Sequence, residues 1–302
     1  MTRRVADVTA AAQLACLLEA SAPKPGNVSP GRDFPDASYE DFLASAAAIG
    51  PALASELPLG ATINAAIRAT GQWTRSNTNL GMVLLLAPLA RAARSSARAA
   101  RSSARAAQSS ARAAQSSARA AQSSAQPSAP SSLALRDALH NVLASTTVED
   151  AREVYAAIRL ARPGGLGTVA EEDVADEPGV ALTDAMRMAA DRDSIAAEYA
   201  TDFRITFEIG LPALIEAQSL GWQEATVRTF LALLAEIPDT HIARKFGSSV
   251  AADVSRRARS AVGAGPEGRA HFDEELRSAG VNPGTTADLT AAALYVALLR
   301  DR

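Results

Sequence analysis

The sequence predicts an all-α protein, built as a single multi-helix, bundle-like domain over residues 1–302 with a low-complexity Ala/Ser/Arg insertion at 94–130. Three observations support this prediction. Apolar residues recur every three or four positions along most of the chain, as they do on one face of an amphipathic helix. Polar pairs with capping-box spacing precede several of these runs. Strands and helices do not alternate, which excludes the parallel-sheet folds that bind dinucleotides.

The individual helices follow from local patterns. Val5, Val8, Ala12 and Cys16 form the apolar face of the first helix. Residues 205–209 alternate like a strand, but the helical face on either side of them continues through, so we predict helix there. The predicted helices cover residues 4–21, 38–55, 60–75, 78–93, 132–145, 147–161, 181–191, 193–218, 222–236, 248–263, 267–279 and 284–300.

Helix starts are marked by capping boxes, in which a Ser or Thr is followed three residues later by an acid. The sequence contains three such pairs, each ahead of an apolar-periodic run: Ser38 with Asp41, Thr147 with Asp150, and Thr285 with Asp288. We therefore expect each of these hydroxyl residues to cap a helix.

The insertion consists of near-identical seven-residue repeats, RSSARAA and QSSARAA, which run from Arg94 to Ser128. Residues 91–132 comprise 16 Ala, 13 Ser, 7 Arg, 4 Gln and 2 Pro. Because no large side chain is available to pack, we interpret this stretch as a solvated insertion or a helix extension between two helices of the body. Its arginines could instead bind an acidic partner.

Composition excludes several classes of protein. The chain is 48% apolar and has 30 basic against 33 acidic residues, but without 91–132 the remaining charge is −10. An acidic body argues against nucleic-acid binding, and the longest apolar run, 82–90, is far shorter than the ~18 residues that span a membrane. A single cysteine, Cys16, excludes internal disulfides and thiolate metal clusters. We expect a soluble cytoplasmic protein.

Two polar loops in the first part of the chain are candidates for chemistry. In Lys24-Pro25-Gly26, the Pro-Gly pair predicts a type II turn that lets the backbone approach a ligand, and Arg32 and Asp36 follow it. The segment 75–81, RSNTNLG, places Asn and Thr at a helix start, where free amides can also hold phosphate. The alternative is that these loops only connect and cap helices.

Two later loops are also polar. Residues 162–167 are rich in Gly, lack the P-loop ending, and precede acids that could collect Mg²⁺ or simply be solvated. Residues 238–247 contain Asp239, His241, Arg244 and Lys245, and Lys24 and Lys245 are the two lysines of the chain. Asp239 could alternatively cap a short helical turn that ends at Gly247.

Taken together, the loops resemble the triphosphoribosyl-dephospho-coenzyme A synthase family. The family pattern has KPG after the first helix, an Asp before a helix with FLxS, an NTHKG segment, and a late DTN…RGG segment. The chain has these in the same order over about 250 residues, as Lys24-Pro25-Gly26, Asp36 with Phe42-Leu43-Ala44-Ser45, Asn77-Thr78-Asn79-Leu80-Gly81, and Asp239-Thr240-His241 with Lys245-Phe246-Gly247.

The departures from the pattern concern charge. Asn79-Leu80 replaces the His-Lys of the family, His241 replaces the Asn of DTN, and Lys245-Phe246-Gly247 replaces Arg-Gly-Gly. One cationic contact is thereby missing, and Arg75, Arg244 or Arg32 could replace it. The chain resembles a divergent branch of the family.

The resemblance implies a pentosyltransferase. The family reaction joins the triphosphoribosyl unit of ATP to the 2′-hydroxyl of 3′-dephospho-coenzyme A and releases adenine, which yields a prosthetic-group precursor. A site for this reaction must hold a triphosphate, with Mg²⁺ expected, and offset positive charge on the ribose. We predict catalytic Asp36, Asp239 and His241, with Asp36 and Asp239 as alternative Mg²⁺ ligands. The predicted nucleotide- or phosphate-binding residues are Lys24, Gly26, Arg32, Asn77, Thr78, Asn79, Arg244 and Lys245.

Two other functions are compatible with the same residues. One is a Mg²⁺-dependent helical hydrolase of nucleotides or phosphorylated sugars, in which water attacks in place of the ribose hydroxyl. The other is a helical protein that binds nucleotide without turnover.

Overall fold

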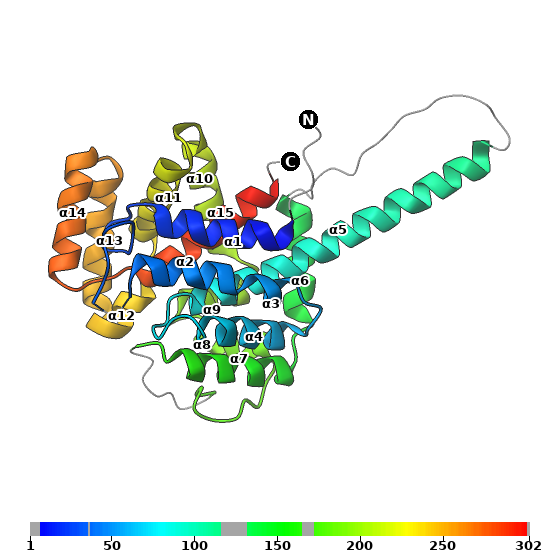
Figure 1. The fold of residues 1–302 in the computed structure, drawn as a ribbon, viewed down its shortest axis with the longest axis horizontal. Helices are drawn as coiled ribbons and strands as arrows, with labels where there is room; N and C mark the ends of the chain where they lie inside the picture. Colours follow the sequence, from blue (N-terminus) through cyan, green and yellow to red (C-terminus); the bar gives the residue numbers. More distant parts are fainter. Residues whose placement is uncertain (1–6, 36, 116–131, 165–171, 301–302) are drawn as a thin grey trace.

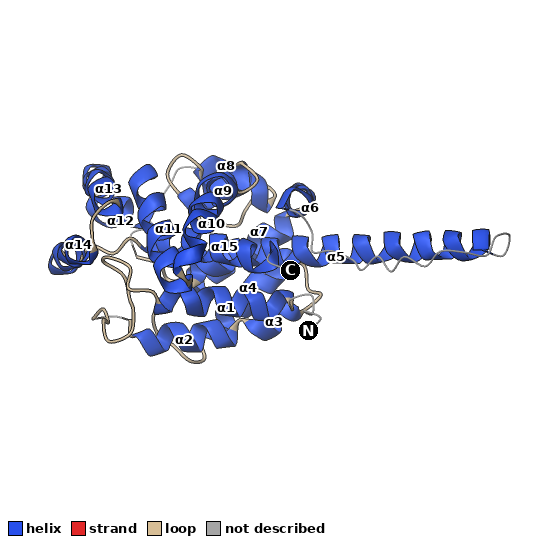
Figure 2. Cartoon of the chain, turned by 90° about the horizontal axis from the view of Figure 1, so that it is seen from above, coloured by secondary structure: helices blue, strands red, loops and turns tan. Residues whose placement is uncertain are grey.

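The computed structural model describes residues 7–35, 37–115, 132–164 and 172–300, in which helices are joined by loops and no strand occurs (Figures 1 and 2). The first helices are α1 (Val8–Ser21), α2 (Tyr39–Ala48), α3 (Gly50–Ala54), α4 (Leu59–Thr70), α5 (Leu80–Gln115), α6 (Ser132–Ala144), α7 (Val148–Ala161), α8 (Leu182–Ala189) and α9 (Ser194–Ala200). The chain continues with the π-helical turn η1 (Thr206–Gly210), α10 (Leu211–Ala217), the 3₁₀ turn η2 (Gln218–Leu220), α11 (Trp222–Glu236), α12 (Thr240–Phe246), α13 (Ser248–Val262), α14 (Pro266–Ser278) and α15 (Gly284–Arg300). The predicted all-α fold is confirmed.

The core is organised around α15, which packs against α1, α5, α10 and α11. Nearly every residue from Thr285 to Leu299 is buried, so this helix has no solvent-facing stripe. A helix that is small or apolar on all sides is typical of the centre of a helical protein. Tyr295 is fully buried there, and its hydroxyl donates to the Val8 carbonyl of α1 at 3.1 Å.

Two of the three predicted capping boxes are confirmed. Ser38 caps α2 with Asp41, and Thr147 caps α7 with Asp150. The third prediction is wrong, because α15 already begins at Gly284 and Thr285 lies inside its first turn. Asp288 therefore lies in the second turn of α15 and does not belong to a capping box.

Two predicted helices are divided in the structure. The predicted helix 38–55 breaks at Ile49, because Pro51, which has no N–H, starts α3. The predicted helix 193–218 breaks after α9, where Asp202 and Phe203 have φ of 50° and 59°. Buried Glu198 then accepts the N–H groups of Ile205 and Thr206 at 2.8 and 2.7 Å, and burial raises its pKa to about 7.

Two further boundaries differ from the prediction. A short helix, α12, occupies the loop 238–247, where Asp239 caps it as the alternative interpretation proposed. Helix α5 continues past the predicted end at 93 to Gln115 and projects from the body (Figures 1 and 2). The remainder of the insertion, 116–130, lies outside the described residues. None of the described helices combines the length and apolar character that crossing a membrane requires.

Candidate active site

A cavity of about 300 Å³ opens where the starts of α5, α9 and α15 meet α7, α8 and α12. Its wall contains both apolar and polar residues, which we call the apolar and the polar wall. The apolar wall includes Phe42, Leu80, Met82, Leu84, Ile158, Leu182, Met186 and Ile195. The polar wall is formed by Asn27, Asn77, Thr78, Asn79, Glu172, Asp173, Arg192, Asp193, His241, Arg244, Asn282, Thr285 and Asp288. A concave, partly apolar site with a few converging polar groups is typical of small-molecule binding.

The segment 77–81 forms one side of the cavity. Asn77 caps α5, because its Oδ1 accepts the Leu80 N–H at 3.1 Å. The Asn79 amide donates to Thr70 Oγ1 at 3.1 Å, and the Thr78 hydroxyl bonds Ser45 Oγ at 2.5 Å. These hydrogen bonds fix the segment to α4 and α2, so the part of the cavity wall that it forms is held in place.

Gly81 brings α5 into close contact with α15. A Cβ added to Gly81 would lie 2.0 Å from Asp288 Oδ2 and 2.7 Å from Ile195 Cδ1. Only glycine leaves space for the carboxyl group at this point. Burial, together with the carboxylates of Glu19 and Asp239, raises the pKa of Asp288 well above its ordinary value.

Asp239 joins α12 to α15 from behind the cavity wall. Its Oδ1 accepts the Ile242 N–H at 3.0 Å, and its Oδ2 accepts both the N–H and the hydroxyl of Thr286 at 2.7 Å. Only 2% of Asp239 is exposed, and burial outweighs these hydrogen bonds and raises its pKa. In this position Asp239 sets where His241 and Arg244 lie relative to α15.

Arg244 and Asp193 form an ion pair in the polar wall. Asp193 also caps α9, since its Oδ1 accepts the N–H groups of Ile195 and Ala196 at 2.9 and 3.1 Å. Arg244 Nε is buried and has no hydrogen-bond partner among the described residues. Arg192 adds a second guanidinium to the wall, and its Nη1 donates to the Met188 carbonyl at 2.9 Å. The cavity thus holds two arginines beside several carboxyl groups.

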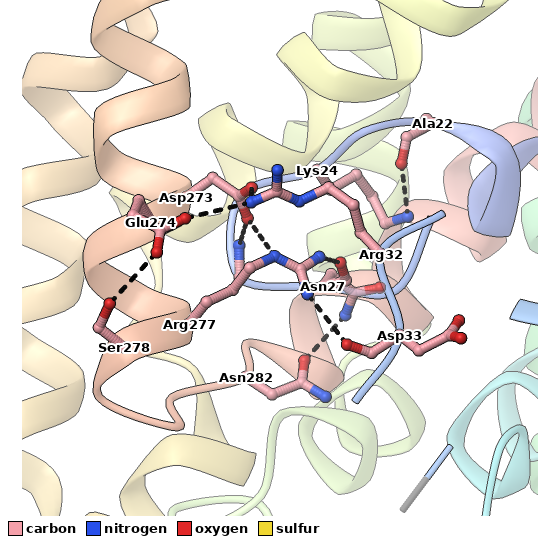
Figure 3. A network of polar contacts seen from close by, with 11 residues as sticks. Ala22, Lys24, Asn27, Arg32, Asp33, Asp273, Glu274, Arg277, Ser278 and Asn282 are labelled. Atoms are coloured by element: carbon pink, nitrogen blue, oxygen red, sulfur yellow. Dashed lines mark hydrogen bonds and ion pairs between the residues drawn. The ribbon is translucent and has the colours of Figure 1, made fainter. Parts of the chain in front are cut away.

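The loop 22–35 is held by α14, and we call this assembly the α14 clamp (Figure 3). Asp273 accepts the Gly26 N–H at 2.7 Å, the Arg277 Nε–H at 2.9 Å, and pairs with Arg32 at 2.7 Å. Arg277 also donates to the Asn27 carbonyl and stacks over the Phe34 ring at 5.2 Å. The clamp is joined to the cavity because the Asn27 amide donates to Asn282 Oδ1 at 2.9 Å.

Lys24 is buried on the inner side of the clamp. Its Nζ lies 3.0 Å from Glu19 Oε1, and both side chains are fully inaccessible to solvent. Nζ also donates to the carbonyls of Glu19 and Ala22 at 2.5 and 3.1 Å. Burial lowers the pKa of Lys24 and raises that of Glu19, while their mutual attraction opposes both shifts.

Comparison with known proteins identifies the family. Residues 5–302 match the family described as ATP:dephospho-CoA triphosphoribosyl transferase (CitG). A crystal structure assigned as a triphosphoribosyl-dephospho-coA synthase from Archaeoglobus fulgidus is 27% identical with a TM-score of 0.63, covering 86% of this chain and 99% of that one. No curated protein matches the chain.

The chain belongs to the ATP:dephospho-CoA triphosphoribosyl transferase family. The predicted resemblance is confirmed, and the protein is a transferase that uses ATP. The family and the structural neighbour both indicate triphosphoribosyl-dephospho-CoA synthase activity.

The structure divides the predicted site residues of this transferase into three groups. Asn77, Thr78, Asn79, His241 and Arg244 line the cavity. The residues that do not line it are Lys24, Gly26 and Arg32 in the clamp, Asp239 behind the wall, and Lys245. Asp36 lies outside the described residues. Their roles stay predictions.

Lys245 is exposed near the mouth of the cavity. Its side chain lies over Gly164, because a Cβ on that glycine would be 3.1 Å from Lys245 Cε. The neighbouring Pro163 lines the cavity. Two polar loops that are remote in sequence, 162–164 and 238–247, therefore meet at this edge.

Three charged residues of the cavity wall were missed by the sequence analysis, namely Arg192, Asp193 and Asp288. Asp193 carries the signature of a helix cap, which it is, and Asp288 carries that of a capping box, which it is not. One available signal was that Asp288 is the single acid in the otherwise apolar and small sequence of α15.

Proposed function

We propose that the cavity is where the C1′ carbon of ATP meets the 2′-hydroxyl of 3′-dephospho-CoA, giving 2′-(5″-triphosphoribosyl)-3′-dephospho-CoA and adenine. The observation that carries the proposal is the joint presence of Arg192, Arg244, His241 and Asp288 around one cavity with an apolar wall. Such a site can hold phosphate oxygens, a planar base and a ribose on which positive charge develops.

Arg244 is the strongest candidate for a phosphate contact. It is anchored by Asp193, so its guanidinium is oriented before a ligand arrives, and its Nε still has a hydrogen bond to donate. Arg192 would supply the second cation. It would compensate for the His-Lys pair of the family, which is replaced by Asn79-Leu80 in this chain. Asn77, Thr78 and Asn79 would bind sugar or phosphate oxygens, and Lys245 at the edge would meet the far end of the triphosphate.

The apolar wall suits the adenine base. Met82, Leu182 and Met186 line the same cavity as the arginines. A planar aromatic base gains from burial against such side chains, and thioethers adapt to its faces. The phosphates and the base would then lie against opposite parts of the wall, with the ribose between them.

Lys24, Gly26 and Arg32 would support the site rather than touch phosphate. Each is engaged within the α14 clamp or with Glu19. The hydrogen bond from Asn27 to Asn282 connects the loop to the cavity wall. Asp239 would act in the same way, by holding α12 against α15.

Mg²⁺ would enter as part of the substrate, bound to the triphosphate. Among the described residues, no group of three or more potential metal-ligating side chains forms a metal site. Mg²⁺ is commonly held by one or two carboxylates together with substrate phosphates, so a preformed protein cage is not required. Use of ATP and the acidic body further favour a cytoplasmic enzyme that does not bind nucleic acid.

One assay tests the function against its alternatives. The purified protein is incubated with ATP, 3′-dephospho-CoA and Mg²⁺, and free adenine is measured by chromatography. Adenine that forms only with both substrates supports transfer. Adenine or phosphate formed without the acceptor would indicate a hydrolase, and ATP binding without product would indicate a non-catalytic binding protein.

A further inference from the structure

Asp288 is a carboxyl group without an internal partner. It lines the cavity from the second turn of α15, a helix whose other residues between Gly284 and Leu299 are small, hydroxyl-bearing or apolar. Among the described residues, no hydrogen bond or ion pair engages its side chain, and only longer-range charges act on it. Asp288 is partly accessible, unlike its neighbours on α15, and it lines the cavity. An acid that reaches a substrate cavity and is not engaged by the protein points to a ligand.

The backbone of α5 is shaped around this carboxyl group. Gly81 stands where any Cβ would overlap Asp288 Oδ2, at 2.0 Å, and Asp288 Cγ, at 2.4 Å. The glycine of the 77–81 segment therefore has a specific purpose, which is to admit the carboxyl group to the cavity between α5 and α15. This contact stands independently of any charge on Asp288.

The charges around Asp288 favour its neutral form. Carboxylates on three elements act on it: Glu19 on α1, Asp239 at the start of α12 and Asp193 at the start of α9. Arg244 on α12 is the cation that acts on it, and that guanidinium is already paired with Asp193. The Cys16 thiol on α1 is also close enough for Asp288 to raise its pKa. Together with burial, this environment raises the pKa of Asp288 well above the ordinary carboxyl value.

We propose that Asp288 is the catalytic acid of the transfer and gives its proton to adenine as the bond between C1′ and the base breaks. The proposal rests on the proposed function and adds to it a residue and a step. A neutral carboxyl group beside the leaving base is a donor, and after donation its carboxylate offsets the positive charge on the ribose.

The step balances with groups on the cavity wall. The electron pair of the C1′–N9 bond leaves with adenine, and the Asp288 proton neutralises the departing base. The acceptor 2′-hydroxyl oxygen forms the new bond to C1′, and its proton passes to His241, which lines the same cavity. Exchange with water then returns a proton to Asp288 and removes one from His241, so the net change moves one proton from the hydroxyl to adenine.

The test compares two leaving groups in the Asp288→Asn variant, which preserves side-chain shape. With ATP we expect kcat to fall about 10²–10⁴-fold, the usual contribution of general acid catalysis. With 8-aza-ATP, whose base leaves readily as an anion, we expect a loss of no more than about tenfold, because a proton donor matters less. The matched control is Asp253→Asn, which changes a half-exposed acid of α13 that pairs with Arg256, and it should leave kcat unchanged with both substrates.

A second variant tests the geometry without removing a titratable group. Gly81→Ala should displace the carboxyl group and reduce kcat with ATP more than with 8-aza-ATP, as Asp288→Asn does. The wild-type kcat should also decline on the alkaline side as Asp288 loses its proton, and this decline should be absent in Asp288→Asn. Circular dichroism and thermal melting confirm that each variant is folded, and Asp288→Ser replaces Asp288→Asn if the latter is not.

Three results would overturn the assignment. Wild-type kcat in Asp288→Asn would show that the carboxyl group is dispensable. An equal loss with both leaving groups would exclude proton donation, and recovery of that loss at high Mg²⁺ would identify a metal ligand instead. If the wild-type protein itself released no adenine from ATP and acceptor, the proposed function would fail first, and this step with it.

Discussion

The cavity wall and the α14 clamp contain similar residues but use them in opposite ways. In the clamp, Asp273 accepts from the Gly26 N–H and from Arg277 while it pairs with Arg32, so its oxygens are fully engaged. In the cavity, Asp288 is engaged by no hydrogen bond or ion pair among the described residues, and buried Arg244 Nε has no hydrogen-bond partner there. Asp273 is thus engaged entirely by the protein, whereas Asp288 and the Arg244 Nε–H are left for a ligand.

This difference matters because both regions carry segments that resemble the same family. KPG lies in the clamp and the NTHKG-like segment lies in the cavity, so a shared family pattern does not imply a shared role. Substitutions in the clamp should therefore change the free energy of unfolding, and substitutions in the cavity should change turnover.

The largest expected effect is in the clamp, at Lys24. Lys24→Met removes the cation from a fully buried pair and leaves Glu19 uncompensated, which should lower the free energy of unfolding by about 3–5 kcal/mol. Urea unfolding followed by circular dichroism measures this loss. The double variant with Glu19→Gln removes both charges and should recover most of it. Wild-type stability with lost turnover in Lys24→Met would place Lys24 in contact with substrate and contradict the comparison.

A pair of arginines gives the next contrast. Arg244→Ala should lower kcat/KM about 100-fold, equivalent to about 2.7 kcal/mol, because it removes an oriented cation from the cavity. Arg32→Ala removes a half-exposed cation from the clamp and should change stability by less than about 1 kcal/mol and kcat/KM by less than about twofold. Steady-state kinetics of both variants decide the matter, and comparable losses in kcat/KM would show that Arg32 also contacts substrate.

Gly26 tests the close packing of the clamp. Its φ is +68°, and an added Cβ would lie 2.8 Å from Leu276 Cδ1 and 3.0 Å from the Val281 carbonyl. Gly26→Ala should therefore destabilise the fold by about 1–3 kcal/mol, with turnover per folded molecule retained. Thermal melting alongside the adenine assay measures both. Unchanged stability would mean that the loop moves freely away from α14.

Much of the fold was predictable because the start of a helix depends on residues that are close together in the sequence. Ser38 with Asp41 and Thr147 with Asp150 form capping boxes from residues three apart, and no tertiary knowledge is needed to see them. The break after α9 was not predictable in this way. It depends on Glu198, whose carboxylate reaches the amides of Ile205 and Thr206 only because it is buried.

The candidate site was predictable where polar residues lie in loops. Asn77 and His241 were found because they interrupt the helical pattern, and both line the cavity. Asp288 was missed because its spacing from Thr285 is that of a capping box, and a capping role left no reason to expect a role in the site. Whether Lys24 faces inward or outward depends on where Glu19 and α15 lie, and periodicity does not contain that information.

The smallest expected effect is on stability, where replacing an Asp by Asn should have opposite signs in the cavity and in the clamp. The pKa of Asp288 is raised above its ordinary value of 3.8, so the folded protein retains a proton that the unfolded chain has released. The free energy of unfolding consequently falls as the pH rises from the ordinary to the raised pKa of Asp288. Above the raised pKa the whole of this loss remains. Asp288→Asn removes this loss of stability and should raise the free energy of unfolding by about 1 kcal/mol at alkaline pH, with no gain at a pH below the ordinary carboxyl pKa.

Asp273→Asn, in the clamp, should instead lower the free energy of unfolding, because Asp273 supports Gly26 and two arginines. Unfolding curves at several pH values measure both variants. A loss of stability in Asp288→Asn at alkaline pH would show that the cavity carboxyl group is structural, as those of the clamp are.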